Sequence, residues 1–159
     1  MTKMIIRTAN EGDIEAIARH NILLARETET RELDPLTVHA GVAAMFTEKS
    51  KGFYLVAEEP GNDKGNKNKE MVIGSLMITF EWSDWRNANM WWIQSVYVLE
   101  KYRSTGVFGK LFRRMRDLAA SKGVCLLRLY VENENELAQK VYKSLGMRQC
   151  RYQMWECPV

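Results

Sequence analysis

The chain has 159 residues, of which 46% are hydrophobic and 27% are charged, and its formal net charge is +3. This composition excludes a disordered chain, and the length fits one folded domain with its own core. No apolar stretch approaches the ~20 residues of a membrane-spanning helix, and the N-terminus lacks the pattern of a signal peptide. We therefore expect a single domain over residues 1–159 and no membrane partner.

The cysteines and histidines are not spaced like metal ligands. Cys125, Cys150 and Cys157 form no CxxC pair, and no thiol lies near His20 or His39. Cys125 falls in an apolar run, as a small buried hydrophobic residue would. An odd number of separated cysteines is typical of a reduced, intracellular protein, so we expect a cytoplasmic location and no metal.

Strand and helix patterns follow one another along the chain. In chain order, the expected elements are a strand at 4–8, a helix that opens at Asn10, a second helix that opens at Asp34-Pro35, strands at 53–57, 71–80 and 90–98, a helix at 106–121, a strand at 124–131, a helix at about 134–144 and a strand at 147–156. Residues 59–70 hold no large apolar side chain and are expected to form an exposed hairpin loop. The order mixes hairpins with βαβ crossovers. It therefore predicts an α+β fold of the three-layer α/β type, with helices flanking a mixed, largely antiparallel central sheet.

Positive charge is concentrated in residues 100–128, which carry eight basic and two acidic side chains. This local charge favours an anionic ligand beside the segment, because a nucleic-acid binder is usually basic over more of its surface. The aromatic residues there, Phe108 and Phe112, fall on the apolar stripe of the predicted helix rather than on an exposed face. We therefore expect no nucleic-acid partner.

The junction between the strand at 90–98 and the helix at 106–121 is suited to binding a pyrophosphate. Amide groups in the first turn of a helix lack intrahelical partners, and glycines let the backbone approach an anion closely. Arg103 and Lys110 add full positive charges. The segment contains Arg103, Ser104, Thr105, Gly106, Val107, Phe108, Gly109 and Lys110. It matches neither a Walker A loop nor a dinucleotide GxGxxG motif, and an ordinary tight turn remains the alternative.

A second informative segment lies in the helix at about 134–144. Asn133 is a candidate N-cap with Glu136 three residues later, and Gly146 ends the helix. Tyr142 lies on the apolar face of this helix, so it is either a core residue or a functional one.

Together the two segments resemble the GNAT (general control non-derepressible-5-related N-acetyltransferase) superfamily. The acyl-CoA loop of that family is [QR]xxGx[GA] after a VxV strand end, and its later motif is NxxAxxxYxxxG. The residues that match are Val96-Tyr97-Val98, Arg103 and Gly106 for the loop, and Asn135, Ala138, Tyr142 and Gly146 for the later motif. Phe108 departs from the Gly or Ala that the family prefers, and its ring is expected to turn into the core. The order of elements resembles the family along nearly the whole chain.

The resemblance implies an acyltransferase that moves an acetyl group from acetyl-CoA to a primary amine of a small molecule or peptide, within a ternary complex. It implies that the backbone of Val96, Tyr97 and Val98 pairs with the pantetheine arm and that amides from Arg103 to Lys110 hold the pyrophosphate. It also implies that Asn135 bonds the cofactor and that Tyr142 protonates the departing thiolate. The alternative is a non-catalytic acyl-CoA-binding or sensor domain.

The general base is less clearly marked. An acceptor ammonium with a pKa of ~10.4 must lose a proton before it attacks. Strand alternation puts Trp92 and Gln94 on the same face as Val96, and neither is a base. Glu81 and Glu132 are the candidates, acting directly or through water, and a solvated surface acid is the alternative for each.

The acceptor pocket is expected beside the first two helices, as the resemblance implies. The connection between them is acidic, which would attract a cationic amine, although a solvated helix end would look the same. Tryptophans in a predicted loop at 81–87 are candidates for a pocket wall. The predicted acceptor-binding residues are Glu27, Glu29, Trp82, Trp85 and Gln94. The sequence leaves open a polyamine, amino acid, amino sugar or peptide amine as acceptor, and a monomer or homodimer as the assembly.

Overall fold

The computed structural model describes residues 4–59 and 71–159, and these divide into two compact units, Met1–Leu129 and Tyr130–Val159. Apart from Glu59, the hairpin loop expected at 59–70 lies outside the described residues. The elements of the first unit are β1 (Ile5–Thr8), the 3₁₀ turn η1 (Glu11–Asp13), α1 (Ile14–Glu29), α2 (Pro35–Thr47), β2 (Gly52–Glu59), β3 (Met71–Ser83), β4 (Ala88–Val98), the 3₁₀ turn η2 (Glu100–Tyr102), α3 (Val107–Ser121) and β5 (Leu126–Arg128). The second unit holds α4 (Glu136–Ser144).

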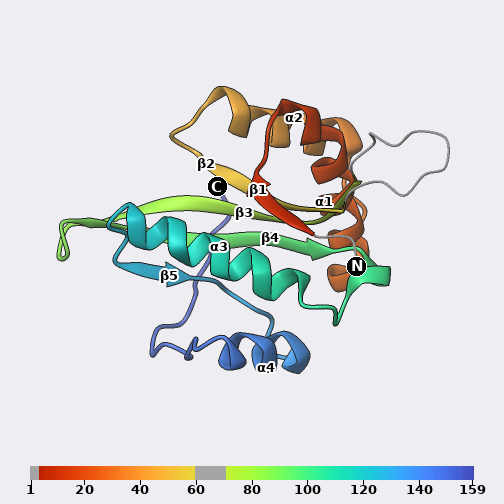
Figure 1. Cartoon of the computed structure of the whole chain (residues 1–159). Helices are drawn as coiled ribbons and strands as arrows, with labels where there is room; N and C mark the ends of the chain where they lie inside the picture. Colours follow the sequence, from red (N-terminus) through yellow and green to blue (C-terminus); the bar gives the residue numbers. More distant parts are fainter. Residues whose placement is uncertain (1–3, 60–70) are drawn as a thin grey trace, which may run out of the picture. The chain divides into compact units, whose positions relative to one another are not determined.

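The strands of the first unit form a five-stranded sheet in the order β1-β2-β3-β4-β5. The pairings β1·β2, β2·β3 and β3·β4 are antiparallel, while β4 and β5 are parallel, with α3 as the crossover between them (Figure 1). The mixed, largely antiparallel sheet predicted from the order of elements is therefore confirmed.

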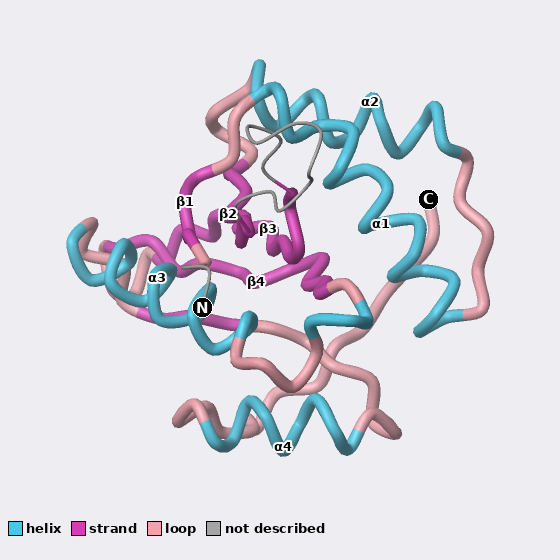
Figure 2. The backbone as a smooth tube through the Cα atoms, turned by 45° about the vertical axis from the view of Figure 1, so that its right-hand side comes forward, coloured by secondary structure: helices cyan, strands magenta, loops and turns pink. Residues whose placement is uncertain are grey.

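The helices of this unit cover opposite faces of the sheet, as two adjacent residues of β3 show. Ser75 Oγ lies 2.9 Å from Nδ1 of His20 in α1. Gly74, its neighbour, faces the other way, and a Cβ atom there would lie 3.0 Å from Cγ1 of Val107 in α3. Since successive strand residues point to opposite faces, α1 covers one face and α3 the other. Figure 2 shows α2 beside α1.

Apolar stripes explain why these helices pack where they do. Ile17 and Ala18 of α1, Met45 of α2, and Tyr54 and Val56 of β2 are all buried in one cluster. On the opposite face, α3 buries Val107, Leu111, Phe112 and Met115. Complete burial of a side chain of this size contributes ~1.5–3 kcal/mol each.

Charged side chains hold the η1 turn against the edge of the sheet. The guanidinium of Arg7 bonds both oxygens of Asp13, at 2.7 and 2.9 Å, and both oxygens of Glu58, at 2.8 and 3.1 Å. Burial opposes ionisation of Asp13, but hydrogen bonds from Arg7 and from the Asn10 amide outweigh it and lower the pKa of Asp13. Asn10 completes a capping box with Asp13, which confirms the predicted helix start.

Two strand predictions are corrected. Residues 147–156 form no strand in the described part of the chain, and β5 covers only 126–128 of the predicted 124–131. A strand requires a neighbour for its hydrogen-bond ladder, so an alternating sequence alone does not make one. β5 is defined by its pairing with Met90–Trp92 of β4, and it ends where that pairing ends.

The second unit begins its helix two residues later than predicted. Asn135, rather than Asn133, is the N-cap of α4, and its Oδ1 accepts a hydrogen bond from the Ala138 amide at 3.0 Å. The helix ends as expected at Gly146, whose φ of 87° lies in the left-handed region that glycine favours.

Candidate active site

A β-bulge interrupts β4 where the stretch that the resemblance assigns to the pantetheine arm begins. Ser75 of β3 pairs with Tyr97, but Met77 pairs with Gln94, so β4 holds one extra residue there. Ser95 has a φ of 49°, a left-handed conformation that is costly for a residue with a side chain. A bulge bends its strand and interrupts the ladder, so backbone groups here turn away from regular pairing.

The bulge overturns one expectation about which side chains share a face. Alternation from Gln94 would put Val96 on the face of Gln94, but the extra residue shifts the pattern by one. Tyr97 therefore lies on the α1 face with Trp92 and Gln94, where its ring centroid is 5.1 Å from that of His20. Val98 lies on the α3 face, next to Gly74.

The edge of β4 opens just before the bulge. β5 pairs with β4 only along Met90–Trp92. From Ile93 to Val98, no strand in the described residues pairs with that edge. An extended ligand with amide groups could bond such an edge as an added strand does.

The loop after this edge leads into the N-terminus of α3. Ser104 and Gly106 have φ values of 63° and 84°, and the Thr105 hydroxyl donates to the Tyr102 carbonyl at 2.7 Å. Apart from atoms of Gly106 and its neighbours in the chain, no described atom lies within 4 Å of the position that a Cβ of Gly106 would occupy. The loop therefore combines open space with the partial positive charge of a helix start, which favours an anion. This space and the open edge of β4 fit the pyrophosphate and pantetheine of acyl-CoA.

Phe108 does not obstruct this loop. Its side chain is partly buried, and its ring centroid lies 6.1 Å from that of Phe112, which belongs to the core. The ring therefore lies beside a core residue but is not fully buried itself, so the expected turn into the core is only partial. Lys110 is exposed one turn into the helix.

Arg103 folds back against β4, although 43% of its side chain stays exposed. Its Nε donates to the Val98 carbonyl at 3.0 Å, and its guanidinium lies 5.4 Å from the centroid of the Tyr97 ring. It also forms an ion pair with Glu27 of α1, whose other oxygen accepts from the Tyr97 hydroxyl at 2.7 Å. Sequence reasoning placed Glu27 with the acceptor and did not find these contacts, because no local pattern links residues so far apart.

Glu81, a candidate base, lies on the α1 face near the end of β3. Its carboxylate accepts a hydrogen bond of 2.6 Å from the Trp92 indole and pairs with Arg128 of β5 at 3.0 Å. On the same face, the Gln94 amide donates to the Thr79 hydroxyl at 2.7 Å. This part of the sheet therefore holds fixed polar groups beside the open edge of β4.

The remaining predicted acceptor residues are exposed. Glu29 ends α1, while the exposed fractions of Trp82 and Trp85 are 59% and 89%. Trp82 lies in β3 rather than in the predicted loop, because the strand extends to Ser83. Trp85 lies in the turn before β4.

Three predicted site residues belong to the second unit. Asn135 uses its side-chain oxygen to cap α4, which leaves its NH₂ as the group for a ligand. Burial raises the pKa of the Tyr142 hydroxyl, so this group is protonated at neutral pH. Glu132 is exposed, and its backbone carbonyl accepts a hydrogen bond from the backbone amide of Asn135.

His20 is a buried polar residue that sequence reasoning did not select. Its side chain contacts Ser75 and Tyr97, and burial, aided by the charge of Arg19, lowers its pKa to about 4. It is therefore neutral at physiological pH. A histidine inside an amphipathic helix pattern carries no sequence signal that separates it from a core residue.

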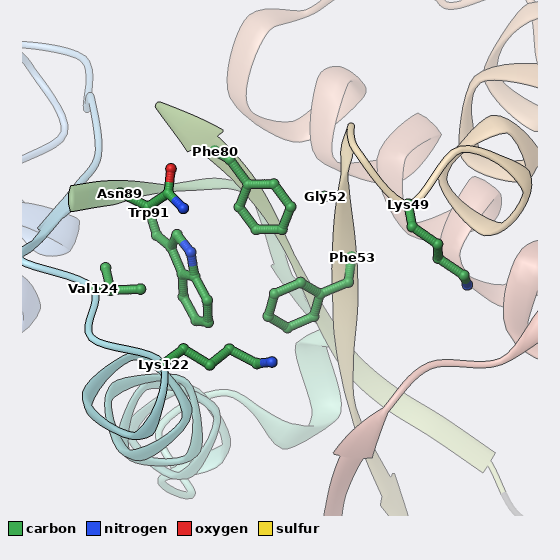
Figure 3. Close-up of a pocket in the computed structure, with 8 residues that line it drawn as sticks. All are labelled: Lys49, Gly52, Phe53, Phe80, Asn89, Trp91, Lys122 and Val124. Atoms are coloured by element: carbon green, nitrogen blue, oxygen red, sulfur yellow. The ribbon is translucent and has the colours of Figure 1, made fainter. Parts of the chain in front are cut away.

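A cavity of about 270 Å³ lies at the other end of α3. Figure 3 shows its aromatic lining of Phe53, Phe80 and Trp91, with Lys49 and Lys122 at its sides. Lys122 follows the last residue of α3, a helix ~20 Å long, so this cavity is remote from the loop at the helix start. Its lining residues include no carboxylate or hydroxyl for acyl transfer. The open edge of β4 is therefore the better candidate for the active site.

Three further features are the possible metal ligands, the apolarity of the helices and the exposure of Cys125. Within residues 4–59 and 71–159, no cluster of side chains could hold a metal ion, and none of the helices is long and apolar enough to cross a membrane. Cys125 is exposed rather than buried as predicted, because it precedes β5 and lies outside the packed part of the sheet.

Comparison with known proteins defines the class of the protein. Residues 16–147 match the model of the Acetyltransferase (GNAT) family. A thialysine N-epsilon-acetyltransferase from Bos taurus is 30% identical over 161 aligned positions, which cover 99% of this chain and 92% of the relative. These similarities identify an acyltransferase. The chain belongs to the GNAT acetyltransferase family.

Solved structures agree with this assignment. A possible acetyltransferase from Clostridium difficile 630 is 40% identical, with a TM-score of 0.86 and coverage of 98% of this chain and 97% of the other. A predicted acetyltransferase with acetyl-CoA from Clostridium acetobutylicum has a TM-score of 0.75 at 17% identity, covering 98% and 96% of the two chains. The second likeness shows the shared fold alone.

Proposed function

We propose that the protein transfers the acetyl group of acetyl-CoA to a primary amine on a small molecule or peptide, by direct attack within a ternary complex. The observation that carries this proposal is the bulged, open edge of β4 next to the loop at the start of α3. This pairing of an open strand edge with an anion-binding helix start suits a cofactor that has both amide groups and phosphates.

Binding of the cofactor involves backbone more than side chains. The edge at Val96–Val98 bonds the pantetheine amides, and amides of the loop from Arg103 to Lys110 hold the pyrophosphate. Asn135 adds a bond from its NH₂. Acetyl-CoA supplies a thioester, whose acyl carbon is open to attack by an amine.

Two kinds of group in the protein stabilise or neutralise the negative charge that develops during acyl transfer. Backbone donors at the bulge of β4 stabilise the negative charge on the carbonyl oxygen, since they are fixed before the reaction starts. Tyr142 then supplies a proton to the departing sulfur, and its raised pKa keeps that proton in place until the thiolate forms.

The acceptor approaches on the α1 face, where Glu81 and Gln94 are held by Trp92 and Thr79. Glu81 removes the ammonium proton, directly or through water, and Glu132 is the second candidate for that role. Glu29, at the end of α1, favours a cationic amine through its charge. The two predicted tryptophans do not join it there, because Trp82 shares the α3 face with Phe80 and Trp85 lies in the turn before β4.

The name of one relative supports a particular class of acceptor. The relative from Bos taurus is named for transfer to the ε-amine of thialysine. We therefore place primary amines at the end of a flexible chain, in amino acids or polyamines, first among the acceptors. The family match crosses both compact units, which supports one domain over 1–159. The three free cysteines support a reducing, cytoplasmic compartment.

The decisive experiment is an acetylation screen with release of free thiol as the readout. Lysine, thialysine, polyamines, amino sugars and a lysine peptide are each supplied with acetyl-CoA. Amine-dependent release of CoA supports the enzyme. Tight binding of acetyl-CoA with no turnover on any amine would favour the sensor alternative.

A further inference from the structure

Glu27 connects α1 to the end of β4 and to the loop before α3. One carboxylate oxygen accepts a 2.7 Å hydrogen bond from the Tyr97 hydroxyl, and the other pairs with the guanidinium of Arg103. Because Tyr97 is only 5% exposed, water has little access to compete for the hydrogen bond of its hydroxyl. Both oxygens of Glu27 therefore bond partners within the protein, although 38% of its side chain stays exposed.

The ionisation states favour these contacts. Burial opposes ionisation of Glu27, but hydrogen bonds from Tyr97 and Arg103 outweigh it and lower the pKa of Glu27. Burial and the neighbouring carboxylate raise the pKa of Tyr97 to about 12. At neutral pH the carboxylate is charged and the phenol keeps its proton, so one accepts and the other donates.

Arg103 is the link between Glu27 and the phosphate loop. Its Nε bonds the Val98 carbonyl, and its guanidinium lies over the Tyr97 ring. These contacts hold the first residue of the loop against β4. The next residue, Ser104, has a left-handed φ of 63°, a conformation that persists only when its surroundings hold it in place.

We propose that Glu27 is a positioning residue for acyl-CoA: by holding Arg103 against Tyr97 and Val98, it keeps the phosphate loop in its binding shape before the cofactor arrives. The inference rests on the proposed function, since it requires that this loop binds the cofactor. Without Glu27, the phosphate loop must become ordered when acetyl-CoA binds, and the conformational entropy lost in that step reduces the affinity for acetyl-CoA.

The test compares Glu27→Gln with Glu15→Gln. Glu15 lies on the same helix, with its side chain 90% exposed, so its replacement removes the same charge without touching the network. Calorimetry with acetyl-CoA should show a Kd about five-fold higher for Glu27→Gln and unchanged for Glu15→Gln, which corresponds to loss of a partly exposed ion pair and one hydrogen bond. The KM for the acceptor amine should stay constant.

Two further variants show whether Glu27 acts through its partners. Tyr97→Phe, which removes only the hydroxyl, should raise the Kd by a smaller factor. In an Arg103→Gln background, adding Glu27→Gln should change the Kd for acetyl-CoA little further, because the ion pair between the two side chains is already lost. Tyr97→Phe also keeps the test available if Glu27→Gln fails to fold.

The outcomes separate this inference from the proposed function. If the wild-type protein binds no acetyl-CoA, both are overturned. If it binds, but the folded Glu27 and Tyr97 variants bind equally well, only the positioning role is overturned. A Glu27→Gln variant that raises the acceptor KM alone also overturns it, and would assign Glu27 to the acceptor pocket.

Discussion

Replacing Gly106 by aspartate separates binding of the cofactor from folding. Gly106 has a left-handed φ of 84°, and a Cβ added there would meet open space beyond its own neighbours in the chain. Asp and Asn enter the left-handed region more readily than other residues with side chains, and the cost is ~1–2 kcal/mol. An acid beside a helix N-terminus recovers ~0.3–1 kcal/mol of this. The variant should therefore fold.

The effect on acetyl-CoA is expected to be larger. A carboxylate ~5 Å from one phosphate charge is repelled by ~0.8 kcal/mol at a water-like dielectric constant of ~80 and by ~3 kcal/mol at ~20. Two phosphate charges double even the smaller value, so the Kd should rise at least about ten-fold.

The matched control is Gly106→Asn, which has nearly the same shape and backbone preference but no charge. Calorimetry should show a much weaker complex for Gly106→Asp than for Gly106→Asn, and the difference should shrink at high salt. Equal affinities for the two folded variants would refute the placement of the phosphates at this loop.

Three further predictions test other parts of the argument. Tyr142→Phe should lower kcat by about 10²-fold with little change in the KM for acetyl-CoA, and unchanged turnover, when chemistry limits the rate, would make Tyr142 a core residue. Glu29→Gln should raise the KM for a cationic acceptor two- to five-fold in steady-state assays, and identical acceptor kinetics in both proteins would place the pocket elsewhere. Asp13→Asn should lower the free energy of unfolding by about 2–3 kcal/mol at pH 7, because it removes the buried carboxylate that pairs with the half-buried Arg7. Because the pKa of Asp13 is lowered in the folded state, its charge stabilises the fold fully above pH ~4, and this stabilisation is lost as the pH falls further. Urea denaturation should therefore show the stabilities of the wild type and Asp13→Asn converging in acid. A difference that stays constant with pH would contradict the role of this charge.

The sequence by itself determined the order of the elements as far as α4, two of the caps and the two motifs that indicate the family. Asn10 and Asp34 are followed by apolar residues at helical spacing, and each caps the helix start that was expected of it. These features are local. A capping side chain bonds a backbone amide two or three residues away, and an apolar stripe depends only on the residue spacing within one helix. The family resemblance likewise rests on residues close together in the chain.

Tertiary structure alone decided the details of the candidate site. The extra residue in β4 reverses the faces of Tyr97 and Val98, and it is visible only through pairing with β3. Tyr97, which bonds Glu27, and Arg128, which pairs with Glu81, lie 70 and 47 residues away from them. The predicted strand at 147–156 is missing because nothing in its unit pairs with it. Strand register and long-range ion pairs depend on which segments meet in space. A periodic sequence sets which side chains are apolar, but the partner that each strand edge and each carboxylate finds is set by the packed fold.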